Sequence, residues 1–134
     1  MYKRLLVYVD SGETRLIELE GLLDLADQLG ARVIALTVLA PEPANPSEEE
    51  TKSRDELEDR AWNFLYQIED MAFSREIKNS LMLEEGETIQ AISSVVASYE
   101  VDICATFNYR NIDIPALLDK LDKVPLLLLN QEGQ

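Results

Sequence analysis

Few residues in this chain could carry out acid–base or nucleophilic chemistry, because the sequence has no histidine and a single cysteine, Cys104. Without an imidazole, nothing is present that commonly activates a serine or cysteine nucleophile or acts as a base at neutral pH. One cysteine cannot supply a structural zinc site, so we interpret Cys104 as a small core residue. The carboxylates do not pair at the ends of the expected strands. We therefore expect no enzyme activity, no metal site and no bound cofactor.

The residue best placed to contact a ligand is Asp10. It directly follows the apolar run of residues 5–9, which we predict to be a buried strand. In parallel α/β sheets, ligands bind at the carboxyl ends of the central strands. A polar residue at a strand-to-helix junction also commonly just accepts hydrogen bonds from turn amides. The sequence leaves both roles open for Asp10.

Composition limits the classes of partner. The 134 residues, 46% of them apolar, suit one domain over residues 1–134. There are 26 acidic and 12 basic residues, and the net charge of -14 repels nucleic acid and anionic lipid. A single cysteine fits a reducing compartment, no apolar run reaches membrane-spanning length, and residues 1–9 are too short for a signal peptide. We expect a cytoplasmic protein without nucleic-acid or membrane partners.

The spacing of apolar residues predicts strands that alternate with helices. After the first strand we expect helices over residues 13–29, 53–71 and 89–99 and a short helix capped by Asp113, with strands over residues 32–39, 75–83, 101–107 and 124–129. Ser11 and a Ser53–Glu56 capping box are the expected starts of the first two helices, and Gly30 the end of the first.

Such alternation indicates an α/β fold, a Rossmann-like three-layer sandwich around a five-stranded parallel sheet. The first and fourth strands are the most apolar and should lie together in the centre, whereas the strand over residues 75–83 mixes charged and apolar residues and should lie near an edge. The order 3-2-1-4-5 satisfies these conditions. It places the topological switch point beside Asp10 and Phe107.

Several segments resemble the universal stress protein family in their order and spacing over nearly the whole chain. The opening strand and turn of the family are similar to residues 1–13, MYKRLLVYVDSGE. Later similarities are Leu25-Ala26, Leu29-Gly30-Ala31, Glu85-Gly86-Glu87, Val101-Asp102 and Val124-Pro125. The resemblance implies a five-stranded α/β sandwich, usually dimeric, that acts in stress adaptation. Many members of the family bind ATP and others do not.

The resemblance also implies where ATP would bind. In ATP-binding members, an Asp after the first strand and a residue of the second hold the adenosine end, and the matching positions are Asp10 and Val38. The phosphates lie on a Gly-x2-Gly-x9-Gly-Ser/Thr stretch after the fourth strand, where glycine lets backbone N–H groups approach them.

Here the first two glycine positions are Phe107 and Arg110, and no glycine occurs between Gly86 and Gly133. The segment over residues 102–125 also looks several residues short, and we expect the Phe107 ring to occupy space that the family leaves empty. The chain therefore resembles a degenerate member that does not bind ATP tightly. Arg110 either offers a cation to another anionic ligand or lies in a plain exposed loop.

Two functions follow from these observations. The first is a regulatory or interaction protein of the stress response without catalysis. The alternative is a small-molecule sensor that binds adenine nucleotide or another ligand at the switch point through Asp10, Val38 and Arg110. Residues typical of nucleotidyl transferases, ATP pyrophosphatases, receiver domains and flavodoxins are not matched.

The last expected strand predicts a homodimer. Its four leucines are Leu126, Leu127, Leu128 and Leu129, and no charged residue lies among them. An edge strand without such a charge tends to pair with a second copy of the chain across a twofold axis. The alternative is that the protein's own helices cover this strand.

Overall fold

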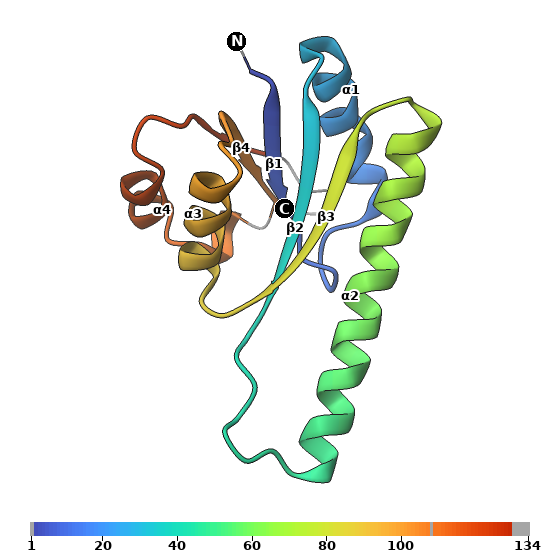
Figure 1. The fold of residues 1–134 in the computed structure, drawn as a ribbon, viewed down its shortest axis with the longest axis vertical. Coiled ribbons are helices and arrows are strands. Elements are labelled where there is room, and N and C mark those ends of the chain that lie inside the picture. Colours follow the sequence, from blue (N-terminus) through green and yellow to red (C-terminus); the bar gives the residue numbers. More distant parts are fainter. Residues whose placement is uncertain (1, 108, 130–134) are drawn as a thin grey trace.

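The computed structural model describes residues 2–107 and 109–129, which form a five-stranded parallel sheet between two layers of helices (Figure 1). The strands are β1 (Arg4–Tyr8), β2 (Arg32–Leu39), β3 (Asn79–Glu85), β4 (Ile103–Thr106) and β5 (Leu126–Leu128). The helices are α1 (Leu19–Leu29), α2 (Glu48–Ser74), α3 (Thr88–Ser98) and α4 (Ile114–Leu121), with short 3-10 helices η1 (Leu16–Glu18) and η2 (Tyr109–Asn111). The strand order β3-β2-β1-β4-β5 confirms the predicted topology.

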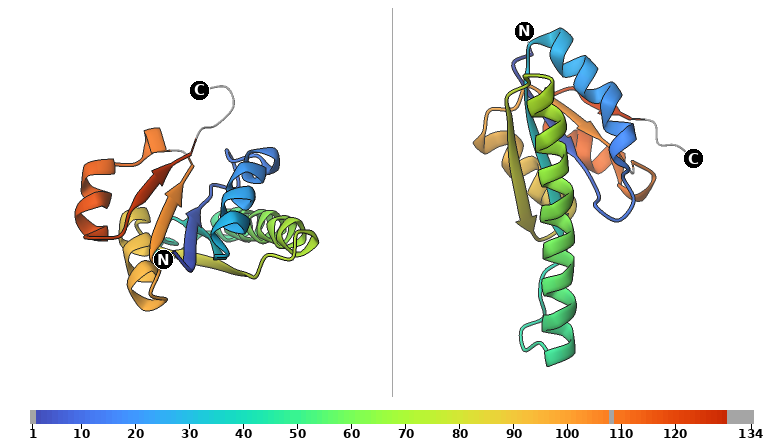
Figure 2. Two further views of the ribbon diagram at one scale, coloured as in Figure 1. Left: turned by 90° about the horizontal axis from the view of Figure 1, so that it is seen from above. Right: turned by 90° about the vertical axis from the view of Figure 1, so that its right-hand side faces the viewer.

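Each face of the sheet has its own core. Helices α1 and α2 cover one face and α3 and α4 the other (Figure 2). Alternation along β1 sends Leu5 and Val7 into the α1–α2 side, which we call the first core, and Leu6 and Tyr8 into the α3–α4 side, the second core. Cys104 is fully buried in the second core, as predicted, and burial raises the pKa of its thiol to about 12.

The first helix begins later than predicted. Ser11 lies in a turn rather than at an N-cap, and α1 starts only at Leu19, after η1. Before it, Arg15 has extended backbone, and its N–H donates to the Glu18 carboxylate (2.8 Å). Local hydrogen bonding therefore overrides the apolar spacing in this segment. Gly30 ends α1 in the left-handed region (φ 67°), as predicted.

The second helix begins earlier than predicted. Its capping box is formed by Ser47 and Glu50, not by Ser53 and Glu56. Three glutamates in the first turn interact favourably with the positive end of the helix dipole and stabilise this earlier start. The apolar spacing on which the prediction rested begins farther along the helix. The first buried residue of α2 is Ala61, and the amino-terminal half projects beyond the sheet (Figure 2).

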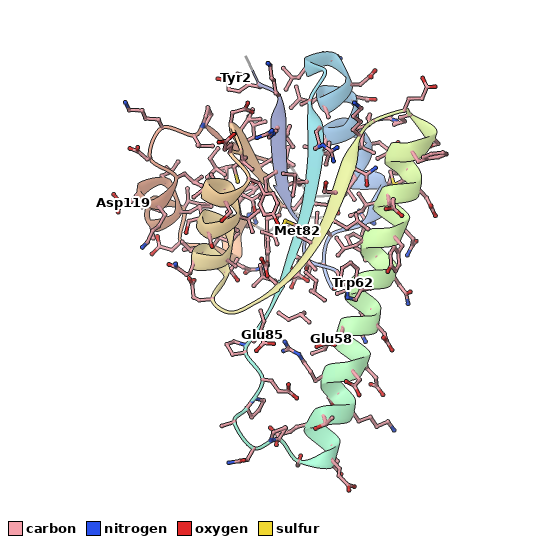
Figure 3. The ribbon with its side chains drawn as sticks, viewed as in Figure 1. Tyr2, Glu58, Trp62, Met82, Glu85 and Asp119 are labelled. Carbon is pink, nitrogen blue, oxygen red and sulfur yellow. The ribbon has the colours of Figure 1, made fainter. Side chains whose placement is uncertain are left out.

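Arg54 ties this projecting half to the body of the protein. Its guanidinium donates to the Ala40 carbonyl, to Glu85 Oε2 (2.8 Å) and to Glu58 Oε1 (3.3 Å). The two glutamates approach each other from α2 and from the end of β3 (Figure 3). The Arg54 side chain is only 11% exposed, so these charge-assisted bonds are partly shielded from water.

Strand β3 starts at Asn79 because the preceding residues form the turn that leaves α2, with Glu76 at φ 59°. It lies at a sheet edge, as predicted. Within residues 2–107 and 109–129, no helix is both long and apolar enough to cross a membrane.

Candidate functional site at the carboxyl edge of the sheet

Asp10 lies just past the carboxyl end of β1, as predicted, and is held by four hydrogen bonds in the following turn. Its Oδ1 accepts from the Gly12 N–H (2.8 Å), and its carbonyl accepts from the N–H groups of Glu13 (3.1 Å) and Thr14 (2.7 Å). Its own N–H donates to Thr14 Oγ1 (3.0 Å). These contacts are those of a turn-stabilising residue. A contact between Asp10 and a ligand stays a prediction.

Val38 lies in β2, the strand that pairs with β1. The paired register of the two strands ends at Tyr8 and Leu36, two residues before Asp10 and Val38. Val38 is partly buried against the second core. Both positions therefore lie at the carboxyl edge of the sheet, and a contact of either with an adenosine group stays a prediction.

Arg110 lies in η2 after β4 and is exposed. Its neighbour Asn111 connects this segment to the turn after β1, because Asn111 Nδ2 donates to Glu13 Oε2 at 3.5 Å. Arg110 thus belongs to the same edge of the sheet as Asp10. A role for its charge in ligand binding stays a prediction.

The Phe107 ring lies in the first core, and the expectation that it fills space the family leaves empty stays a prediction. The side chain is 1% exposed and packs in the first core, whereas Val38 packs against the second. Residues Ile103 and Ala105 of β4 also face the first core, and Phe107 continues that alternation. Phe107 therefore serves packing on the α1–α2 side of the sheet.

The amino end of α4, where a phosphate group would approach, offers few N–H groups. Asp113 caps the helix as predicted, and its Oδ1 accepts from the Ala116 N–H (3.2 Å). Pro115, the second residue of the helix, has no N–H to donate, and the Leu117 N–H already donates to the Asp113 carbonyl (3.0 Å). The Asp113 carboxylate also places a negative charge at the positive end of the helix dipole.

Tyr8 was not identified in the sequence as part of this site. It is 7% exposed and packs in the second core. Burial raises the pKa of Tyr8 and is the largest cause. The negative charge of Asp10 and, less strongly, that of Glu13 raise this pKa further, whereas a hydrogen bond with Thr88 lowers it. The signal in the sequence was its spacing of two residues from Asp10, which puts both on one face of the strand.

No group of three or more His, Cys, Asp and Glu side chains in the described part of the chain is arranged to hold a metal ion. The residues gathered at this edge are the Asp10 carboxylate held in a backbone turn, the aliphatic side chain of Val38 and the exposed cation of Arg110.

Comparisons with known proteins agree with this architecture. The model of the universal stress protein family matches residues 1–105 and so ends just before the segment that would carry the phosphate-binding glycines. No curated protein matches the sequence.

Several solved structures share the fold. A universal stress protein family member from Burkholderia pseudomallei is 16% identical, with 97% of each chain covered and a TM-score of 0.77. An Arabidopsis thaliana family protein with AMP bound is 11% identical, with 98% of this chain and 93% of that one covered and a TM-score of 0.68. An Archaeoglobus fulgidus universal stress protein in complex with dAMP is 12% identical, with 96% and 98% covered and a TM-score of 0.64.

Proposed function

This chain belongs to the universal stress protein family, and on that basis we propose that it is a regulatory or interaction protein of the stress response that does not bind ATP tightly. The observation that carries the proposal is the amino end of α4. Asp113 occupies the Ala116 N–H, and Pro115 removes another donor. A phosphate group would have to displace a carboxylate that belongs to the protein itself.

Charge supports the same conclusion. ATP brings about four negative charges, which backbone N–H groups, a metal or basic side chains must balance. The protein has a net charge of -14, and the sequence from Phe107 to Asp113 contains a single cation, Arg110, and no glycine. Electrostatic repulsion therefore opposes a triphosphate more strongly than it opposes a ligand of lower charge.

A sensor of nucleoside monophosphates is the alternative. The pairing of β1 with β2 supports it, because Asp10 and Val38, the positions that the resemblance assigns to adenosine, lie at the same edge of the sheet. Relatives of the same fold have been solved with AMP and with dAMP. In this alternative the Asp10 carboxylate contacts the ligand while its Oδ1 keeps the Gly12 hydrogen bond.

We also propose that the protein is not an enzyme. The chain lacks histidine, and its only thiol, that of Cys104, is buried with a raised pKa. A thiol in that state is a poor nucleophile.

A homodimer through β5 is part of the proposal. The strand lies at the sheet edge, and Leu128 is 46% exposed there. Leu127 and Leu129 pack partly against the first core and Leu126 against the second. The protein's own helices thus cover Leu126, Leu127 and Leu129 only in part. A second copy would bury their remaining exposed surface together with that of Leu128.

Isothermal titration calorimetry with Mg-ATP and with AMP tests the proposal, together with mass spectrometry of the protein as purified. We expect no saturable heat with Mg-ATP and no copurified ATP. A dissociation constant for ATP in the low micromolar range, about -8 kcal/mol of binding free energy, would overturn it. Saturable AMP binding that Asp10→Ala abolishes would establish the sensor alternative instead.

A further inference from the structure

Three cations stand side by side where the strands begin, at the edge of the sheet opposite Asp10. Arg4 of β1 pairs in register with Arg32 of β2. On the other side of β2, Val33 pairs with Asn79, so Lys78 lies next to Arg32, and the Val33 N–H donates to the Lys78 carbonyl (2.9 Å). The three strands start together at the top of Figure 1. We call Arg4, Arg32 and Lys78 the cationic row.

The cationic row faces the α3 side of the sheet. Arg4 and Arg32 precede by two residues Leu6 and Ile34, which pack in the second core. Ile77 packs in the first core, so the next residue, Lys78, faces the other side.

An open hollow of about 350 Å³ lies at this place. Arg4 and Arg32 line it together with Ile34, Ser80, Ser98, Tyr99 and Glu100. The hollow therefore combines two guanidinium groups and two hydroxyl groups with one aromatic ring, which is 49% exposed.

The charges of the row are only partly balanced within the described residues. Arg4 Nη1 donates to Glu100 Oε2 (3.1 Å) and to the Tyr99 carbonyl (3.2 Å). Arg32 Nη1 donates to Ser80 Oγ (2.8 Å) and to the Asn79 carbonyl (3.3 Å), which are uncharged. In residues 2–107 and 109–129, neither Arg32 nor Lys78 has a carboxylate partner.

Placing like charges on neighbouring strands is unfavourable. It is also unusual in a chain with more than twice as many acidic as basic residues, 26 against 12. An anion between Arg4 and Arg32 would relieve this repulsion. At Arg4 an anion would replace the Glu100 carboxylate, which is 84% exposed and can return to solvent, whereas at Arg32 there is no carboxylate to displace among the described residues.

We propose that this hollow binds a small phosphomonoester, with the phosphate on the cationic row and the organic part over Tyr99 and Ile34. Guanidinium groups bind phosphate oxygens through paired N–H donors, and serine hydroxyls add further donors. The aromatic ring and the aliphatic floor favour a ligand whose organic part is flat and apolar. The site lies at the opposite edge of the sheet from Asp10 and Val38, so it stands or falls separately from the function proposed above.

Titrations followed by NMR test the site, with inorganic phosphate and phenyl phosphate as probes at constant ionic strength and pH 8. We expect saturable shifts of the Ser80, Tyr99 and Glu100 amides, with phenyl phosphate binding more tightly than phosphate. Arg32→Met should weaken both by about tenfold or more, as expected for the loss of a charge-assisted hydrogen bond. Tyr99→Ala should weaken phenyl phosphate alone.

Arg60→Met is the matched control, because it removes the same charge from an exposed position on α2. It should leave both affinities unchanged. Arg4→Met serves as a second test should Arg32→Met lose its native spectrum, and it should also weaken phosphate, because Arg4 lines the same hollow. Absence of saturation, equal effects of Arg32→Met and Arg60→Met, or acetate binding as tightly as phosphate would each overturn the proposal.

Discussion

Replacing Phe107 tests whether this residue is a packing element or an obstruction. The ring is 1% exposed in the first core, so Phe107→Ala removes a fully buried aromatic side chain and leaves a cavity among tightly packed neighbours. Such substitutions cost about 3–5 kcal/mol. Since domains of this size are stable by roughly 5–15 kcal/mol, the variant should fold but unfold at a much lower urea concentration.

Urea unfolding followed by circular dichroism measures this cost, and Leu118→Ala on α4 is the control. Leu118 is 48% exposed, so its truncation should cost about 1 kcal/mol or less. A cost below about 1 kcal/mol for Phe107→Ala would refute the buried placement of the ring.

Phe107→Gly extends the test to function, because it introduces the glycine that the resemblance to ATP-binding family members would imply at this position. We expect no gain in ATP affinity from it, since the limiting features are Asp113 and Pro115 at the amino end of α4. A gain in affinity would show that the ring, and not the helix end, excludes the nucleotide.

Four further predictions address other parts of the molecule. Asp10→Asn keeps the oxygen that accepts from Gly12 and should cost at most about 1 kcal/mol in urea unfolding, less than Asp10→Ala. Arg54→Met should speed amide hydrogen exchange in the first three turns of α2, while Arg60→Met should not, because Arg54 links that segment to Glu85. Leu128→Lys, at the exposed leucine of β5, should turn a dimer into a monomer in sedimentation velocity; a wild-type monomer at micromolar concentration would contradict the proposed dimer. Burial raises the pKa of Cys104 from 9.0 to about 12, so the stability that the neutral thiol contributes is present below pH 9 and lost as pH rises toward 12; Cys104→Ala should lose less stability over that range.

The sequence predicted β1, β2 and β4 well because each is a short apolar run, and burial on both faces leaves a signal that does not depend on neighbours. It predicted the starts of α1 and α2 poorly. The start of α2 lies in an acidic, exposed segment without apolar spacing, where Ser47 and not Ser53 finds its glutamate three residues later. The start of α1 is delayed by the mutual hydrogen bonds of Asp10 and Thr14, which have no periodic signature.

The candidate site was predictable in position but not in detail. The strand order that the sequence predicted puts β1 beside β2, so that Asp10 and Val38 lie at the same edge of the sheet. The face of the sheet on which the Phe107 side chain packs depends on whether the alternation of β4 continues past Thr106. The sequence alone does not determine this. The cationic row could not be seen in the sequence at all, since Arg4, Arg32 and Lys78 become neighbours only through the register of three strands.

The two edges of the sheet treat an incoming anion differently. Helices α3 and α4 begin at the carboxyl edge, where their positive dipole ends would favour phosphate. Both ends are already occupied, because Glu87 accepts from the N–H groups of Ile89 and Gln90, and Asp113 accepts from Ala116.

At the opposite edge the helices end, and their negative dipole ends are met by the chain's own cations: Arg4 donates to the Tyr99 carbonyl after α3. Arg32 and Lys78 take no part in this compensation, since within the described residues neither contacts a helix end or a carboxylate. The chain's own carboxylates thus occupy the helix starts at the carboxyl edge, and positive charge is left at the other edge. Phenyl phosphate should therefore respond to Arg32→Met and not to Asp10→Ala, whereas a nucleoside held through its base and sugar should show the reverse.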